Sequence, residues 1–138
     1  ESDSDATLQY LLLAWPIVDP YSRYRFFQEI GNDRIISLSE DYFSTTDNMK
    51  EGSPFHILQR KENPTLPPTL IIQGTEDRNL PVPVTAQFVA AYRKAGGDIE
   101  LELFPGMPHL FANTPGRESD RAILLMKKFA AKRLSQEL

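Results

Sequence analysis

The 138-residue sequence contains no cysteine, which excludes disulfide bonds, thiolate metal ligands and a cysteine nucleophile. Clustered positive charge is also missing, because the net charge is −4 at pH 7 and no run of Lys or Arg exceeds two residues. Binding to a phosphate backbone needs a concentrated positive patch, so we expect no nucleic-acid partner. The longest apolar run, Tyr10–Val18, falls far short of the roughly 20 residues that span a membrane.

Signatures of cofactors and metals are missing too. The two histidines, His56 and His109, are far apart, and no paired-histidine helix motif surrounds either of them. No phosphate loop or dinucleotide fingerprint occurs, and Gly96-Gly97 precedes a strand pattern rather than a helix, so we expect no cofactor. Residues 1–5 are acidic where a signal peptide is cationic, which favours a cytoplasmic over a secreted protein.

The composition is that of an ordinary globular domain, with 41% hydrophobic and 25% charged residues. Three segments predict strands, near residues 8–15, 69–73 and 99–104. The first is continuously apolar, as in a strand buried on both faces, and the third alternates between apolar and acidic residues, as at a sheet edge. Because a helix pattern over Val84–Ala95 separates the last two, we predict an α/β fold with a parallel sheet of three strands and flanking helices.

Further helices are predicted on both sides of this unit. In the aromatic-rich segment 21–66 we predict two short helices, over 22–30 and 38–45, joined by Gly31-Asn32. Ser37 and Glu40 are spaced as in a capping box, which makes Ser37 the N-cap of the second helix. A terminal helix is predicted over Thr114–Leu134, with the following side chains facing inward: Ile123, Met126, Phe129, Ala130 and Leu134.

Two short loops carry the residue types needed for acid–base chemistry. Gly74–Asp77 follows the second predicted strand, and Gly106–His109 follows the third. Since the carboxyl ends of neighbouring parallel strands lie about 4.8 Å apart, these loops can bring a carboxylate onto an imidazole. A carboxylate bonded to one ring nitrogen leaves the other nitrogen to act as a general base. Asp77 and His109 are therefore the candidate catalytic pair, with a turn-capping aspartate and a structural histidine as the alternative.

The remaining candidates are weaker. Glu76 is expected to face solvent, and Asp98 lies at the opposite end of its strand from the two loops. His56 has no carboxylate signal nearby in the sequence, so we interpret it as structural or facing a lid.

Four motifs, in this order and spacing, resemble the C-terminal half of α/β-hydrolase esterases, in particular carboxylesterases and hormone-sensitive-lipase-like enzymes. They are Ala14-Trp15-Pro16-Ile17-Val18-Asp19-Pro20, Gly52-Ser53-Pro54, Pro68–Asp77 with Leu80-Pro81-Val82 after it, and Phe104-Pro105-Gly106-Met107-Pro108-His109-Leu110-Phe111. The resemblance implies one partial hydrolase domain over 1–138. Segment 21–66 would be cap-like and connecting, and segment 67–138 would carry the acid and histidine loops. It also implies that Asp77 is the triad acid, that His109 is the triad histidine, and that the substrate is a small-molecule carboxylic ester.

One part of the family pattern does not occur in the sequence. No G-x-S-x-G elbow is present around any serine, and the family's oxyanion loop is also missing. We therefore expect the nucleophile upstream of Glu1, and we expect this chain to be inactive alone. The strand Tyr10–Trp15 would then have one unpaired edge, through which the chain would join the missing half or self-associate.

Two other functions remain open from the sequence. A prolyl-oligopeptidase-like peptidase has similar acid and histidine loops near its C-terminus. A non-catalytic binding module would explain the missing serine. For the esterase, we expect the aromatic helices of residues 21–45 to help wall the acyl pocket.

Overall fold

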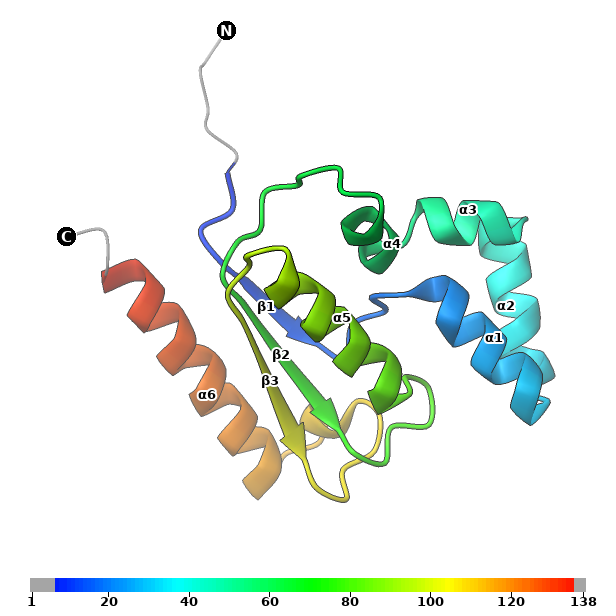
Figure 1. The fold of residues 1–138 in the computed structure, drawn as a ribbon. Helices are drawn as coiled ribbons and strands as arrows, with labels where there is room; N and C mark the ends of the chain where they lie inside the picture. The colour runs from blue at the N-terminus through cyan, green and yellow to red at the C-terminus, as the bar shows by residue number, and fades with distance from the viewer. Residues whose placement is uncertain (1–6, 136–138) are drawn as a thin grey trace, which may run out of the picture.

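A computed structural model describes residues 7–135, so the acidic opening on which the cytoplasmic expectation depends lies outside the described residues. Helical segments separate the strands along the chain (Figure 1). In order they are β1 (Leu11–Ala14), α1 (Pro20–Ile30), α2 (Asp33–Phe43), α3 (Thr46–Glu51), α4 (Pro54–Gln59), β2 (Thr69–Gly74), α5 (Val82–Lys94), β3 (Ile99–Phe104), a 3₁₀ turn η1 (Phe111–Asn113) and α6 (Arg117–Leu134).

The sheet has the order β1-β2-β3 with all strands parallel, which confirms the predicted fold class and places β2 beside β3. β1 is shorter than predicted. It ends at Ala14 because Trp15 takes a positive φ of 43° and Pro16 has no N–H for the ladder. β1 is half-buried rather than buried, since within the described residues it pairs only with β2.

Helices cover both faces of the sheet (Figure 1). Side chains of β2 alternate between the two faces, so Ile71 packs with Phe88 and Tyr92 of α5. Leu70 and Ile72 point the other way, into a cluster with Phe129 of α6. The central strand is therefore buried along its whole length, which gives the two loops that follow β2 and β3 a rigid base.

The terminal helix differs from its prediction in extent and in orientation. α6 begins at Arg117 rather than at Thr114, because the backbone is extended at Thr114 (φ −104°, ψ 124°) and again at Gly116, the N-cap of the helix. Ile123 and Leu134 are 42% and 50% exposed, so placing them inward was wrong. The small side chain of Ala122, fully buried, allows the helix to approach the sheet closely, and Phe129 lies two turns further along the same face.

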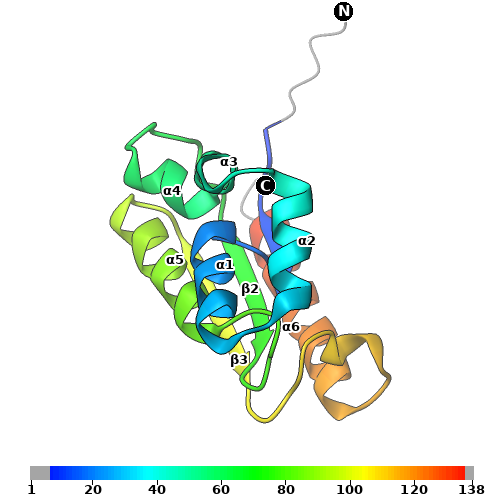
Figure 2. The same ribbon diagram turned by 90° about the vertical axis from the view of Figure 1, so that its right-hand side faces the viewer.

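The segment between β1 and β2 contains four helices rather than two. Gly31 closes α1 in the left-handed conformation, and the Asn32 side chain accepts the Ile35 N–H to cap α2. The predicted N-cap, Ser37, lies inside α2 instead, so the capping-box prediction was wrong. Figure 2 shows α1 and α2 side by side. No helix within residues 7–135 is long and apolar enough to cross a bilayer.

Candidate active site

The loops after β2 and β3 are held together by backbone contacts. Glu76 N donates to Met107 O at 3.0 Å, and Thr75 N donates to Phe104 O at 3.0 Å. A Cβ on Gly74 would collide with the carbonyl oxygen of Met107, so only glycine permits this approach of the two loops.

Gly106 adds a second link between the loops. Its φ of 72° is left-handed, which turns the chain directly after β3. Its N–H donates to the Thr75 hydroxyl oxygen at 2.8 Å. Asp77 and His109 thus lie at the ends of two short loops that are linked to each other by these hydrogen bonds.

The structure brings Asp77 and His109 into contact. Asp77 Oδ2 lies 2.8 Å from His109 Nδ1, and the aspartate side chain is fully buried while the histidine side chain is 24% exposed. Asp77 Oδ1 accepts the backbone N–H groups of Asn79 at 2.8 Å and Leu80 at 2.9 Å. Because both carboxylate oxygens act as acceptors, Nδ1 carries the imidazole proton, and Nε2 presents a lone pair.

Arg23 of α1 supports the loop that carries the acid. Its Nε donates to Asn79 O at 2.7 Å, and its guanidinium lies over the Phe27 ring, 5.2 Å from the centroid. Burial lowers the pKa of Arg23, and the attraction of the Asp77 carboxylate opposes this effect. Sequence reasoning missed this residue, since nothing in the sequence connects α1 with a loop more than 50 positions away.

Trp15 and Leu110 were also missed as parts of the site. The Trp15 indole packs edge-on against the His109 imidazole, with 6.1 Å between centroids, and against Phe111 at 5.7 Å. Trp15 and Leu110 have positive φ values of 43° and 60°, a strained conformation for residues with a Cβ. Strain on both sides of the imidazole indicates that tertiary packing determines the ring's position.

The other sequence candidates lie apart from this pair. Glu76 is exposed, and Asp98 is exposed before β3, 2.5 Å from Arg133 Nη2. Sequence reasoning found no sign of a carboxylate near His56, but the fold brings Asp19 beside it, with 3.5 Å between Asp19 Oδ1 and His56 Nδ1. Ser53 Oγ lies between them, 3.2 Å from Asp19 Oδ1 and 3.0 Å from His56 Nδ1.

This second cluster is structural. Ser53 is fully buried, so its hydroxyl cannot reach a substrate. Ser53 Oγ caps α4 by accepting the His56 N–H, and Asp19 caps α1 by accepting the Ser22 N–H. The Asp19-Pro20 and Ser53-Pro54 pairs have the pattern of an N-cap followed by proline at N1, which is the signal that could have revealed both caps.

A cavity of about 390 Å³ lies beside His109, between the site and helices α1 and α2. Its walls include the aromatic Trp15 and, from α2, the aliphatic side chains Ile35 and Leu38. Of the aromatic residues within 21–45, Phe26 lines a second hollow that Asp77 also borders. Two arginines, Arg23 and Arg34, also line the cavity beside His109.

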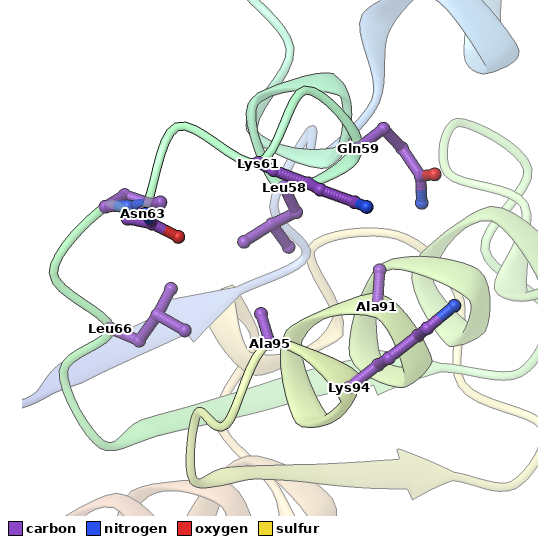
Figure 3. Close-up of a pocket in the computed structure, with 9 residues that line it drawn as sticks. Leu58, Gln59, Lys61, Asn63, Leu66, Ala91, Lys94 and Ala95 are labelled. Atoms are coloured by element: carbon purple, nitrogen blue, oxygen red, sulfur yellow. The ribbon is translucent and has the colours of Figure 1, made fainter.

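A third cavity, of about 310 Å³, lies at the other end of the sheet (Figure 3). Leu58 of α4 and Ala91 of α5 border it, together with Leu66 ahead of β2. It is therefore remote from the loops that follow β2 and β3. Within residues 7–135, no three side chains of the metal-binding types converge on a common point.

A parallel sheet with a buried acid after one strand and a histidine after a later strand matches the order of acid and histidine in α/β-hydrolases. The chain belongs to the prolyl oligopeptidase family, whose family model matches residues 10–137. The match confirms that the chain is part of an α/β-hydrolase, and the family is the one that sequence reasoning had kept as its alternative.

Among solved structures, the chain is similar to esterase 2 of the planctomycete Thermogutta terrifontis. The propionate-bound form shares 25% identity at a TM-score of 0.65, covering 96% of this chain and 47% of that chain. The form phosphorylated by paraoxon shares 30% identity at a TM-score of 0.53, covering 60% and 32%. The chain thus spans about half the length of this esterase or less. A comparison with curated proteins found no match.

Proposed function

We propose that this chain supplies the acid and the general base of a serine hydrolase that cleaves carboxylic esters, with Asp77 and His109 in these roles. The observation that carries the proposal is the 2.8 Å contact between Asp77 Oδ2 and His109 Nδ1 at the carboxyl ends of adjacent parallel strands. Family membership and the similarity to an esterase support the same class of reaction.

In the proposed mechanism, His109 accepts a proton and then donates it in each half-reaction. Nε2 takes the proton of a serine hydroxyl while the serine oxygen bonds to the ester carbonyl carbon. As the carbon–oxygen bond to the alcohol breaks, the Nε2–H gives that proton to the departing oxygen. Water then takes the place of the alcohol, and the same steps release the acid and restore the serine. Asp77 remains ionised throughout and stabilises the imidazolium that forms in between.

The serine and the oxyanion donors would come from polypeptide outside this sequence, which has no G-x-S-x-G motif. We propose that this polypeptide pairs with the edge of β1 that faces away from β2, which contacts no other strand in the described part of the chain. Leu11 N and Trp15 N donate toward β2. Because N–H groups alternate in direction along a strand, those of Leu12 and Ala14 point toward the open side. Trp15, at the end of β1, already contacts His109, so a strand added there would end beside the imidazole.

Peptide hydrolysis is the second candidate, and membership in the prolyl oligopeptidase family favours it. Ester hydrolysis is favoured by the similarity to an esterase whose structures hold propionate and butyrate. The aliphatic walls of the cavity beside His109 suit the apolar part of either substrate. A non-catalytic module would keep the same scaffold without turnover.

The test uses the whole protein that carries this chain, with p-nitrophenyl butyrate and a matched peptide p-nitroanilide as substrates. His109→Ala is expected to lower ester turnover roughly 10⁴-fold, because it removes the general base. His56→Ala is the matched control, because the second histidine lies away from the loops of the site. Faster cleavage of the anilide than of the ester would favour the peptidase.

Paraoxon supplies a readout that is independent of the substrate. We expect it to modify one serine outside residues 1–138, which peptide mass spectrometry would locate. A modified serine inside this chain would contradict the proposed division of the site. Absence of both modification and turnover would favour the non-catalytic module.

A further inference from the structure

The charge of the cavity beside His109 differs from that of the chain. The chain carries 19 acidic and 15 basic residues. Among residues 7–135, two arginines, Arg23 and Arg34, border the cavity, and no aspartate or glutamate does. The nearest carboxylate of the site, that of Asp77, is fully buried, and its two oxygens are occupied by His109 and the backbone of the following turn.

Neither arginine is neutralised within the described part of the chain. Arg23 gives its Nε to the Asn79 carbonyl and forms no ion pair with any described carboxylate. Arg34, in the first turn of α2, is exposed and forms no ion pair or hydrogen bond with any described residue. Burial lowers the pKa of Arg23, and the attraction of the Asp77 carboxylate, with which Arg23 forms no ion pair, only partly opposes this effect.

Most of the other residues around the cavity are apolar, including Ile17 ahead of α1, Leu38 on α2 and Leu110 beyond His109, and Asn79 is a polar neighbour. A mostly apolar cavity bordered by two cations is suited to a ligand that has an apolar body and one anionic end. Arginine binds carboxylates through two parallel N–H donors, which fixes orientation as well as charge.

The place of His109 indicates which part of the substrate enters the cavity. A general acid must lie within hydrogen-bond reach of the oxygen or nitrogen that departs. The departing alcohol or amine therefore lies beside the imidazole when it takes its proton, and the cavity that His109 borders is in position to hold that group.

We propose that the cavity binds a leaving group that carries a carboxylate, held by Arg34 and Arg23. This inference deepens the proposed hydrolase function and rests on it. For an ester, the substrate class is an ester of a hydroxy acid. For a peptide, it is a bond close to a free C-terminal carboxylate.

The test compares two esters with the same acyl group, 3-(butyryloxy)benzoate and its methyl ester, on the whole protein that carries this chain. The measured quantity is the ratio of kcat/KM for the anionic ester to kcat/KM for the neutral ester. Arg34→Met is expected to lower this ratio about tenfold to hundredfold, as for a lost charged hydrogen bond. Comparing ratios between variants cancels the difference in intrinsic reactivity of the two esters.

Three further measurements separate charge recognition from a structural effect. Arg34→Lys is expected to keep part of the preference, and raising the salt concentration is expected to reduce the preference of the unmodified protein. Arg25→Met is the matched control, because Arg25 is exposed on α1 and bonds only Gln28 among the described residues. Its ratio should equal that of the unmodified protein.

The outcomes distinguish this inference from the function beneath it. If both esters are hydrolysed and Arg34→Met leaves the ratio unchanged, the anionic leaving group is disproved and the hydrolase remains. If neither ester is hydrolysed and paraoxon modifies no serine, the hydrolase fails and this inference fails with it.

Discussion

Gly74 lies directly against the carbonyl of Met107, so the last residue of β2 contacts the loop that follows β3. The same carbonyl oxygen accepts the Glu76 N–H at 3.0 Å. This contact sets the distance between the two loops, and the Asp77–His109 pair depends on that distance. The position of the pair can therefore be changed without touching either residue of the pair.

We expect Gly74→Ala to destabilise the protein by about 1–3 kcal/mol, because the added methyl forces the loops apart in a packed region. Turnover should fall as well, since the carboxylate and imidazole separate. Chemical denaturation and ester hydrolysis measure the two effects. Gly116→Ala is the control, because that glycine has an extended backbone and open space where a Cβ would lie. Equal stability of the two variants would contradict the close contact.

Asp77→Asn keeps the shape of the acid and changes the tautomer of its partner. The amide would donate to His109 Nδ1, so the imidazole proton moves to Nε2 and the base is lost. We expect kcat to fall by about 10⁴-fold with little change in KM. Glu76→Gln, which alters the exposed neighbouring carboxylate, should leave kcat unchanged. Nitrogen NMR of the imidazole reports the tautomer, and an unchanged spectrum in the Asn variant would refute the assignment.

Ser53→Ala tests the second polar cluster as a structural element. The substitution removes the cap of α4 and one buried hydrogen bond to Asp19, so we expect a loss of about 1–3 kcal/mol in the free energy of unfolding. Ser37→Ala is the control, because Ser37 is exposed inside α2 and caps nothing. Loss of turnover in a Ser53→Ala protein that remains as stable as the unmodified one would instead indicate a role in catalysis.

Tyr92 gives the fold a dependence on alkaline pH. Burial raises the pKa of its phenol above 10.0, while the hydrogen bond with Thr69 acts in the opposite direction. The folded state then holds a proton that the unfolded chain releases, so this contribution to stability is complete below pH 10.0 and is lost as pH rises through the raised pKa. Tyr92→Phe should flatten the fall in stability, measured by denaturation across this range. Tyr42→Phe, at an 80% exposed site, should not.

One edge of β1 pairs with no strand among residues 7–135, and this edge predicts association of the chain when it is studied alone. We expect oligomers in size-exclusion chromatography with light scattering, because unpaired strand groups form intermolecular ladders. Ala14→Pro should weaken association, since it removes an N–H on the open side while Trp15 N still donates to Ile72 O. Leu124→Lys removes an exposed apolar side chain of α6 and should change nothing. A stable monomer at every concentration would refute the prediction.

Local sequence patterns were sufficient to predict the strands and to predict which loop follows which strand. The apolar run near Leu12, the alternation over Ile99–Phe104 and the helix between β2 and β3 depend on neighbouring residues, and parallel strands joined by a helix bring both loops to the same edge. The proximity of Asp77 and His109 followed from this topology. Their 2.8 Å contact is what the structure adds.

Tertiary structure alone decided which residues surround the pair. Three contacts join segments that are distant in sequence. Trp15 packs against His109, Arg23 supports Asn79, and the carboxylate of Asp19 lies beside His56. The buried face of α6 was decided in the same way, because closeness to the sheet selected the small Ala122 over Ile123. Periodicity reports which side chains are apolar. Packing between elements determines which of them become buried, and which polar groups meet, because burial and hydrogen bonding depend on positions in space that no local pattern encodes.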